Sequence, residues 1–218
     1  VRSVVESIRY NEDSKRRAEP FIDTPRFEKS MKDYTILTPY FTPTLSPLIP
    51  SVMKVLGYHV ETLPQSTGLS ADMGLRFANN EVCYPATNYF GLIKHALVSA
   101  GFKDVPVISL ATSSSIQNDQ PGFHINWLKI AKITVTTILF SDCLSKFYNA
   151  AVVREKKKGL AEKLRSKYLD LAKVQIEKNH SKGLLKLLKE AAQEFTDAVK
   201  PNVKLPQVGI VGEIYLKF

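Results

Sequence analysis

Cysteine is scarce in this sequence, which has only two among its 218 residues, Cys83 and Cys143. Two cysteines exclude the disulfide framework that stabilises many small secreted proteins. No secretory signal or transit peptide is recognisable from Val1 onward, so we expect a reducing, cytoplasmic location. A valine at position 1 in place of methionine suggests a fragment of a longer chain.

Long apolar runs are also missing. The longest, Ile133 to Phe140, is interrupted by threonines and falls far short of the roughly 20 residues that a membrane-spanning helix needs. Acidic residues are in the minority, 21 against 30 Lys and Arg, so the formal charge is +9. This charge is compatible with nucleic acid, a membrane surface or a phosphorylated cofactor as a partner. After Arg154 the basic residues alternate with acidic ones, as on ordinary solvated helix faces.

Several motifs that carry chemistry are absent from the sequence. It has no Walker phosphate loop, no Gly-x-Gly-x-x-Gly run, no Gly-x-Ser-x-Gly elbow and no Cys-x-x-Cys or His-Glu-x-x-His metal signature. The four histidines, which we interpret as structural or surface residues, are His59, His95, His124 and His180. Nucleic acid is an unlikely partner by this measure, because no nucleic-acid-reading motif accompanies the positive charge.

What is present is an alternation of apolar strands and helices. Tyr34–Thr38 is a short apolar run that predicts a buried strand. A helix beginning near Ser46 or Pro50 and ending at Gly57 follows it, and Tyr58–Leu63 is the next predicted strand. This order predicts a parallel pair of strands joined by a crossover helix. Ser70 can cap a further helix that runs to about Ala78.

The later part of the chain is mostly helical in its pattern. A helix capped by Thr87 or Asn88 extends through Ala100, and 105–110 predicts a short strand buried on both faces. The run 127–152 favours one long helix, although its β-branched residues 133–138 could support a strand instead. Two amphipathic helices follow, with predicted apolar faces formed by Leu160, Leu164, Tyr168 and Leu171 in the first and by Leu184, Leu185, Leu188, Ala192 and Phe195 in the second.

These patterns predict an α/β fold with a three-layer, Rossmann-like parallel sheet, a helical block and the start of a second α/β half. The expected domains are an N-terminal arm (1–30), an α/β domain (31–125), a helical linker or insertion (126–206) and the first strand of a second half (207–218). In such folds the carboxyl ends of the strands are where ligands bind.

The segment 76–86 contains Cys83, which we expect on a loop, since Asn79 and Asn80 interrupt the preceding helix and Pro85 favours extended backbone before it. A lone cysteine is most often a small buried apolar residue. However, Asn79-Asn80-Glu81-Val82-Cys83-Tyr84-Pro85 resembles the signature of 2-hydroxyacyl-CoA dehydratases and CoA-enzyme-activase-related proteins, which include 2-hydroxyglutaryl-CoA dehydratase activators. The segments 34–39, 101–110 and 208–214 also resemble that family, in the family's order.

The resemblance implies that Cys83 is one thiolate ligand of an iron-sulfur cluster, suspected to be of the 4Fe-4S type, with Asn79, Asn80 and Tyr84 around it. It implies a part in low-potential electron transfer and acyl-CoA dehydration, with an acyl-CoA substrate, an ATP-dependent activator or electron donor, and an oligomer as expected partners. A cluster normally needs about four thiolates, so other ligands must come from elsewhere. Cys143 lies in an apolar helical stretch and is interpreted as a core residue.

The resemblance skips a piece between Ala86 and Thr87, where related sequences have a helix, a strand and a glycine-rich Cys-Arg motif. Either this chain has lost that piece or its numbering joins two parts of a longer chain. The second is favoured, because deleting a central strand would damage a packed sheet. If the loss is real, it favours an alternative function: a non-catalytic α/β binding module whose basic helices bind an anionic partner.

Overall fold

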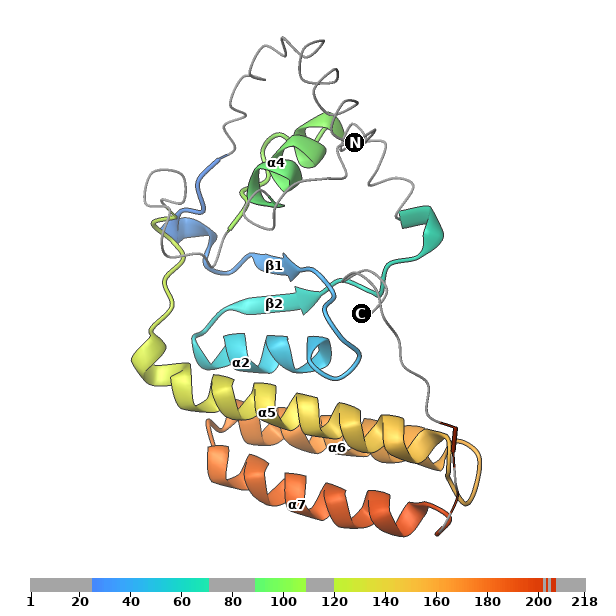
Figure 1. Cartoon of the computed structure of the whole chain (residues 1–218). Coiled ribbons are helices and arrows are strands. Elements are labelled where there is room, and N and C mark those ends of the chain that lie inside the picture. Colours follow the sequence, from blue (N-terminus) through green and yellow to red (C-terminus); the bar gives the residue numbers. More distant parts are fainter. Residues whose placement is uncertain (1–24, 71–88, 109–119, 202, 204, 207–218) are drawn as a thin grey trace, which may run out of the picture. The chain divides into compact units, whose positions relative to one another are not determined.

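The computed structural model describes residues 25–70, 89–108, 120–201, 203, 205 and 206. The described residues form two compact units. One holds 25–31, 66–70, 89–108 and 120–124, and the other holds 32–65 and the described residues from 125 onward. Within them the chain is mixed α/β but mostly helical, and the sheet has two strands (Figure 1). The expected three-layer, Rossmann-like sheet is therefore seen only in part.

The second unit begins with the predicted strand, helix, strand sequence. Strand β1 (Thr35–Thr38) pairs in parallel with β2 (His59–Thr62), so that Ile36 lies opposite Val60. The connection contains a 3-10 turn (Ser46–Leu48) and helix α2 (Ile49–Val55), which starts with prolines in its first turns, where their missing N–H groups cost nothing. The parallel pair and its crossover helix confirm the sequence-based prediction.

Gly57 ends α2 as expected. Its φ of 83° is a left-handed conformation that glycine adopts without steric cost. The N–H groups of Gly57 and Tyr58 donate to the carbonyls of Lys54 and Met53, at 2.9 and 3.2 Å, and so satisfy the last turn of the helix. The reversal places Tyr58, which is buried, at the start of β2.

The prediction that β1 is buried is wrong for one of its faces. Its residues alternate between exposed and half-buried, and Leu37 is 60% exposed. A two-stranded sheet covered by α2 needs apolar residues on one face alone, as Val60 shows by being buried on β2.

Three long helices follow α2 and form an up-and-down bundle: α5 (Trp127–Val152), α6 (Leu160–Glu177) and α7 (Ser181–Ala198). In Figure 1 the sheet, α2 and the bundle lie in successive layers of this unit. The β-branched run within α5 is helical, which resolves the helix-or-strand alternative in favour of the helix. Asn126 caps α5 by accepting a hydrogen bond from the Lys129 N–H, at 3.2 Å.

One hydrophobic core joins the bundle to α2. Leu48 and Val52 pack in the same cluster as the buried residues of the bundle, among them Ile133, Phe140 and Leu144 on α5. The α5 residues recur at helical spacing, which places them on one face. The bundle and the strand pair are therefore parts of one packed unit.

The buried faces of α6 and α7 differ from the predicted faces. Leu171 is 39% exposed and Leu185 is also exposed, whereas both were expected in the core. Tyr168 on α6 and Leu184 and Phe195 on α7 are buried as predicted. The other buried residues of α6 are Ala161, Leu169, Ala172 and Ile176, which the predicted face did not include. Alanines on this face let the neighbouring helices approach closely, and a large residue such as Leu171 then fits better outside.

The first unit contains α4 (Tyr89–Ser99). As predicted, Gly101 terminates this helix, two residues after its last residue, with a left-handed φ of 91°. The predicted strand at 105–110 is wrong over its described part, because residues 105–108 form no strand. Pro106 has no N–H to donate to a ladder. The Val107 carbonyl accepts a hydrogen bond from the Gln120 side-chain amide instead, at 3.2 Å, although Val107 is buried as expected.

Candidate functional site

All four residues of the predicted cluster site, Asn79, Asn80, Cys83 and Tyr84, lie outside the described residues. The join of Ala86 and Thr87 lies outside them too. The cluster site and the proposed break in the chain therefore stay predictions.

Cys143 lies on α5, where it is half-buried and has a free thiol. Next to it on the helix, the Asp142 carboxylate and Lys146 ammonium form an exposed ion pair at 2.8 Å. Across the described ranges, His, Cys, Asp and Glu side chains form no group of three or more that could hold a metal ion. Cys143 thus lies at the edge of the core rather than in its centre.

The loop between β1 and α2 occupies the carboxyl ends of both parallel strands, the usual ligand-binding edge of an α/β sheet. Ser46 organises it: its Oγ accepts hydrogen bonds from the N–H groups of Phe41 and Thr42, at 2.8 and 3.1 Å. The hydroxyl of Thr62, at the end of β2, donates to the Ser46 carbonyl at 2.9 Å. These bonds engage the hydroxyls of Ser46 and Thr62 and two backbone N–H groups of the loop within the protein itself.

Thr44 ties the same loop to the bundle. Its hydroxyl lies 3.1 Å from the Ser141 Oγ on α5, and both side chains are buried. One turn earlier on α5, the buried hydroxyl of Thr137 has no hydrogen-bond partner. The buried hydroxyl pair of Thr44 and Ser141 fixes how the loop sits on α5, since breaking the pair would leave a polar group unsatisfied.

A dense group of cations lies at the end of the bundle where α5 and α7 end and α6 begins. We call it the basic corner, and it consists of Arg154, Lys156, Lys157, Lys158 and Lys200. The α5–α6 connection and the end of α7 meet there in an antiparallel bridge between Glu155 and Val199. The Lys156 N–H donates to the Ala198 carbonyl at 2.9 Å, and the Lys200 N–H donates to the Arg154 carbonyl at 2.8 Å.

Glu155 has a structural role within this corner. Helix α6 starts at Gly159, which has no side chain to cap the helix. The Glu155 carboxylate replaces it, accepting hydrogen bonds from the N–H groups of Gly159 and Ala161 at 2.6 and 2.9 Å. These backbone donors hold the pKa of Glu155 below its ordinary value. Sequence analysis missed this cap; the signal was a helix start without Ser, Thr, Asp or Asn and an acid just before it.

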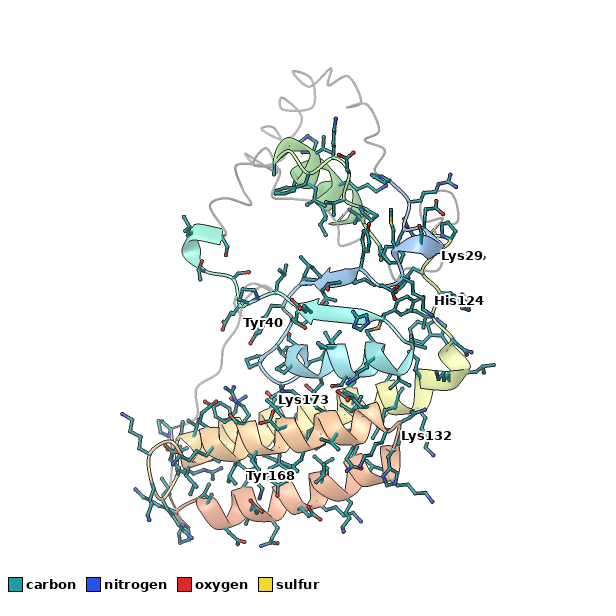
Figure 2. The ribbon with its side chains drawn as sticks, turned by 180° about the vertical axis from the view of Figure 1, so that it is seen from behind. Lys29, Tyr40, His124, Lys132, Tyr168 and Lys173 are labelled. Atoms are coloured by element: carbon teal, nitrogen blue, oxygen red, sulfur yellow. The ribbon has the colours of Figure 1, made fainter. Side chains whose placement is uncertain are left out.

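Two further carboxylates connect the helices. The Glu177 carboxylate accepts from the Lys54 ammonium at 2.7 Å, which joins α6 to α2 and lowers the pKa of Glu177. Glu194 on α7 pairs with Lys167 at 2.6 Å, and this lysine lowers the pKa of Glu194. The buried Tyr168, labelled in Figure 2, hydrogen-bonds Glu194. Burial is the main reason that the pKa of Tyr168 rises to about 12.

Among the described residues, the four histidines belong to no group of side chains that could hold a metal ion. His59 and His124 are exposed, and the His180 Nδ1 lies 3.0 Å from the Gln175 Oε1 in the turn before α7. No helix in the described part of the chain is long and apolar enough to cross a membrane.

Comparison with known proteins yields no match: no family model, no curated protein and no solved structure is similar to this chain.

Proposed function

We propose that this chain is an iron-sulfur-binding component related to the 2-hydroxyacyl-CoA dehydratases and their activators, with Cys83 as one ligand. The observation that carries the proposal is the segment Asn79-Asn80-Glu81-Val82-Cys83-Tyr84-Pro85, together with three other segments in the same order. The parallel strand pair with its crossover helix supports it at the level of the fold, because the proposed relatives need an α/β scaffold. Acyl-CoA and an electron donor would be its partners.

The residues of this chain do not suffice for a cluster on their own. A four-iron cluster needs about four thiolates, and the sequence has two. Cys143 is half-buried on α5, within the bundle unit, and among the described residues it belongs to no group of three or more potential metal ligands. The other thiolates would therefore come from a part of the polypeptide outside this sequence or from a partner, and no reaction step is assigned to this chain.

The test compares Cys83→Ser with Cys143→Ser after anaerobic reconstitution with iron and sulfide. We expect Cys83→Ser to lose most of its iron, its acid-labile sulfide and its visible charge-transfer absorption. Cys143→Ser is the matched control and should keep them, since it changes the chain's other thiol by the same single atom. Equal, non-zero cluster content in the wild type and Cys83→Ser would refute the proposal.

A second candidate function is a non-catalytic binding module for an anionic partner. The observation that favours it is the unequal distribution of charge in the bundle, where cations gather at the α5–α6 connection while Glu177 and Glu194 pair with lysines of neighbouring helices. This candidate needs no cluster, so a failed reconstitution would leave it intact.

A further inference from the structure

The positions of the basic corner's residues are set by the backbone rather than by chance encounters of flexible side chains. The antiparallel bridge holds the chain on either side of Glu155 against the end of α7. Two backbone hydrogen bonds, from Lys156 to Ala198 and from Lys200 to Arg154, flank it. Cations that are 46 positions apart in sequence, Arg154 and Lys200, therefore lie at one end of the bundle.

The negative charges of this end are already engaged. The Glu155 carboxylate points into the start of α6, where it accepts two backbone hydrogen bonds. The Asp197 carboxylate accepts from the Gln193 amide at 3.1 Å. The Lys156 ammonium donates to the backbone carbonyl of Asp197, at 2.7 Å, and not to its carboxylate. Glu162, in the first turn of α6, pairs with Arg165 at 2.7 Å. The five cations therefore leave the basic corner with a net positive charge.

The three consecutive lysines of the corner, Lys156, Lys157 and Lys158, are exposed. Arg154 is half-buried, because its Nε donates to the Ala150 carbonyl at 2.9 Å. Several lysines along the helices, by contrast, have carboxylate partners, as Lys167 has in Glu194 and Lys146 has in Asp142. An end of the bundle whose exposed ammonium groups have no carboxylate partner among the described residues generates a positive potential that steers acidic partners toward it.

The residues beside the corner favour a protein as the partner. Val152 and Val153 precede Arg154 directly and are exposed, Val153 by 58%. Apolar side chains next to cations suit the mixed surface of a protein, whereas phosphate backbones offer no apolar contact. Residues 152–158 include no aromatic side chain on which a base could stack. Lysine, a strongly hydrated point charge, also dominates over arginine, which is preferred for phosphates.

We propose that the basic corner is a docking surface for an acidic segment of a partner protein. Cations that the α5–α6 connection and the end of α7 hold together provide the attraction, and the two valines provide the short-range contact. This inference names the partner of the second candidate function and does not depend on a cluster at Cys83. Its failure would leave the iron-sulfur proposal untouched, because the two are measured by different readouts.

The test uses the full chain, labelled with ¹⁵N, and two probes of similar charge: an acetylated deca-glutamate peptide and the oligonucleotide dT10. We expect the peptide to shift the amide signals of residues 152–158 and 199–200 more than those of the rest of the chain. Lys157→Glu combined with Lys158→Glu should weaken peptide binding about tenfold at low salt, because each change both removes a cation and adds an anion.

The control is Lys182→Glu combined with Lys189→Glu, two exposed lysines on α7 that change the net charge of the protein by the same amount. This control should alter peptide affinity less than twofold. Circular dichroism checks that both double variants keep their helices. Equal weakening by the two pairs would show that the peptide responds to overall charge, which overturns the proposal. Tighter binding of dT10 than of the peptide at the basic corner would overturn it in favour of nucleic acid.

Discussion

Leu144→Ala tests whether α5 is packed as the structure has it. The Leu144 side chain is 0% exposed and belongs to the core cluster that α5 shares with α6, α7 and α2. The substitution removes three carbon groups at about 0.8 kcal/mol each, or about 2.4 kcal/mol, before any cavity is counted. With the cavity, we expect the free energy of unfolding to fall by about 2–5 kcal/mol.

The matched control is Leu128→Ala, the same substitution on the same helix at a side chain that is 99% exposed. Its effect should stay within about 0.5 kcal/mol. Both changes replace leucine by the better helix former, so helix propensity cancels between them. The difference between the two variants therefore measures burial at Leu144 alone.

Urea unfolding and thermal unfolding, both followed by circular dichroism at 222 nm, are the appropriate assays, since the bundle supplies most of the helical signal. At about 2–4 °C per kcal/mol for a chain of this size, the melting temperature of Leu144→Ala should fall by about 4–20 °C. Leu128→Ala should melt within about 2 °C of the wild type. Equal loss of stability in the two variants would refute the assignment of the buried face of α5.

Three further predictions concern turns and titrating groups. Gly57→Ala should destabilise the protein by about 1 kcal/mol in urea unfolding, because the φ of Gly57 is 83°. Gly91→Ala, in helix α4 with open space around it, should stabilise the protein by up to about 1 kcal/mol, and equal effects of the two changes would contradict the left-handed turn at Gly57. The folded state lowers the pKa of Glu155 and Glu177 below the ordinary value of 4.5, so their ionised carboxylates stabilise it above pH 4.5 and the free energy of unfolding should fall as the pH drops below 4.5. The fall should be less steep when both residues are changed to Gln, and identical pH profiles for the variant and the wild type would contradict this prediction. The tyrosinate absorbance at 295 nm should show one group with a pKa near 12, and Tyr168→Phe should remove it; an unchanged late step would contradict the burial of that hydroxyl.

Local features of the fold were predictable from the sequence. Proline and glycine restrict or free the backbone by their own chemistry, which is why the start of α2 and the turns at Gly57 and Gly101 are where the sequence places them. The alternation of apolar segments predicted the parallel pair β1 and β2 because a short helical crossover allows little else. The length of the run 127–152, together with the pattern of the family that the sequence resembles, favoured a helix despite its β-branched residues.

The candidate site was only partly open to this reasoning. The cluster prediction at Cys83 rests on a sequence motif, and that segment lies outside the described residues. The sequence shows the five cations of the basic corner, but not that they lie together, because only the bridge at Val199 brings Lys200 next to Arg154. Likewise, the cap that Glu155 provides depends on the path of the chain into α6.

The sequence by itself determined that α2 ends before Gly57 and α4 before Gly101, because such limits follow from the conformational preferences of single residues. Only the tertiary structure decided which faces are buried. Leu171 and Ala172 are equally compatible with a helix, and the close approach of the neighbouring helices buries the alanine and leaves the leucine 39% exposed. The tertiary structure also decided the hydrogen bonding of Val107, whose burial the sequence predicted but whose carbonyl accepts from the Gln120 side chain and not from a neighbouring strand. Burial depends on partners that are distant along the chain, and local patterns do not contain them.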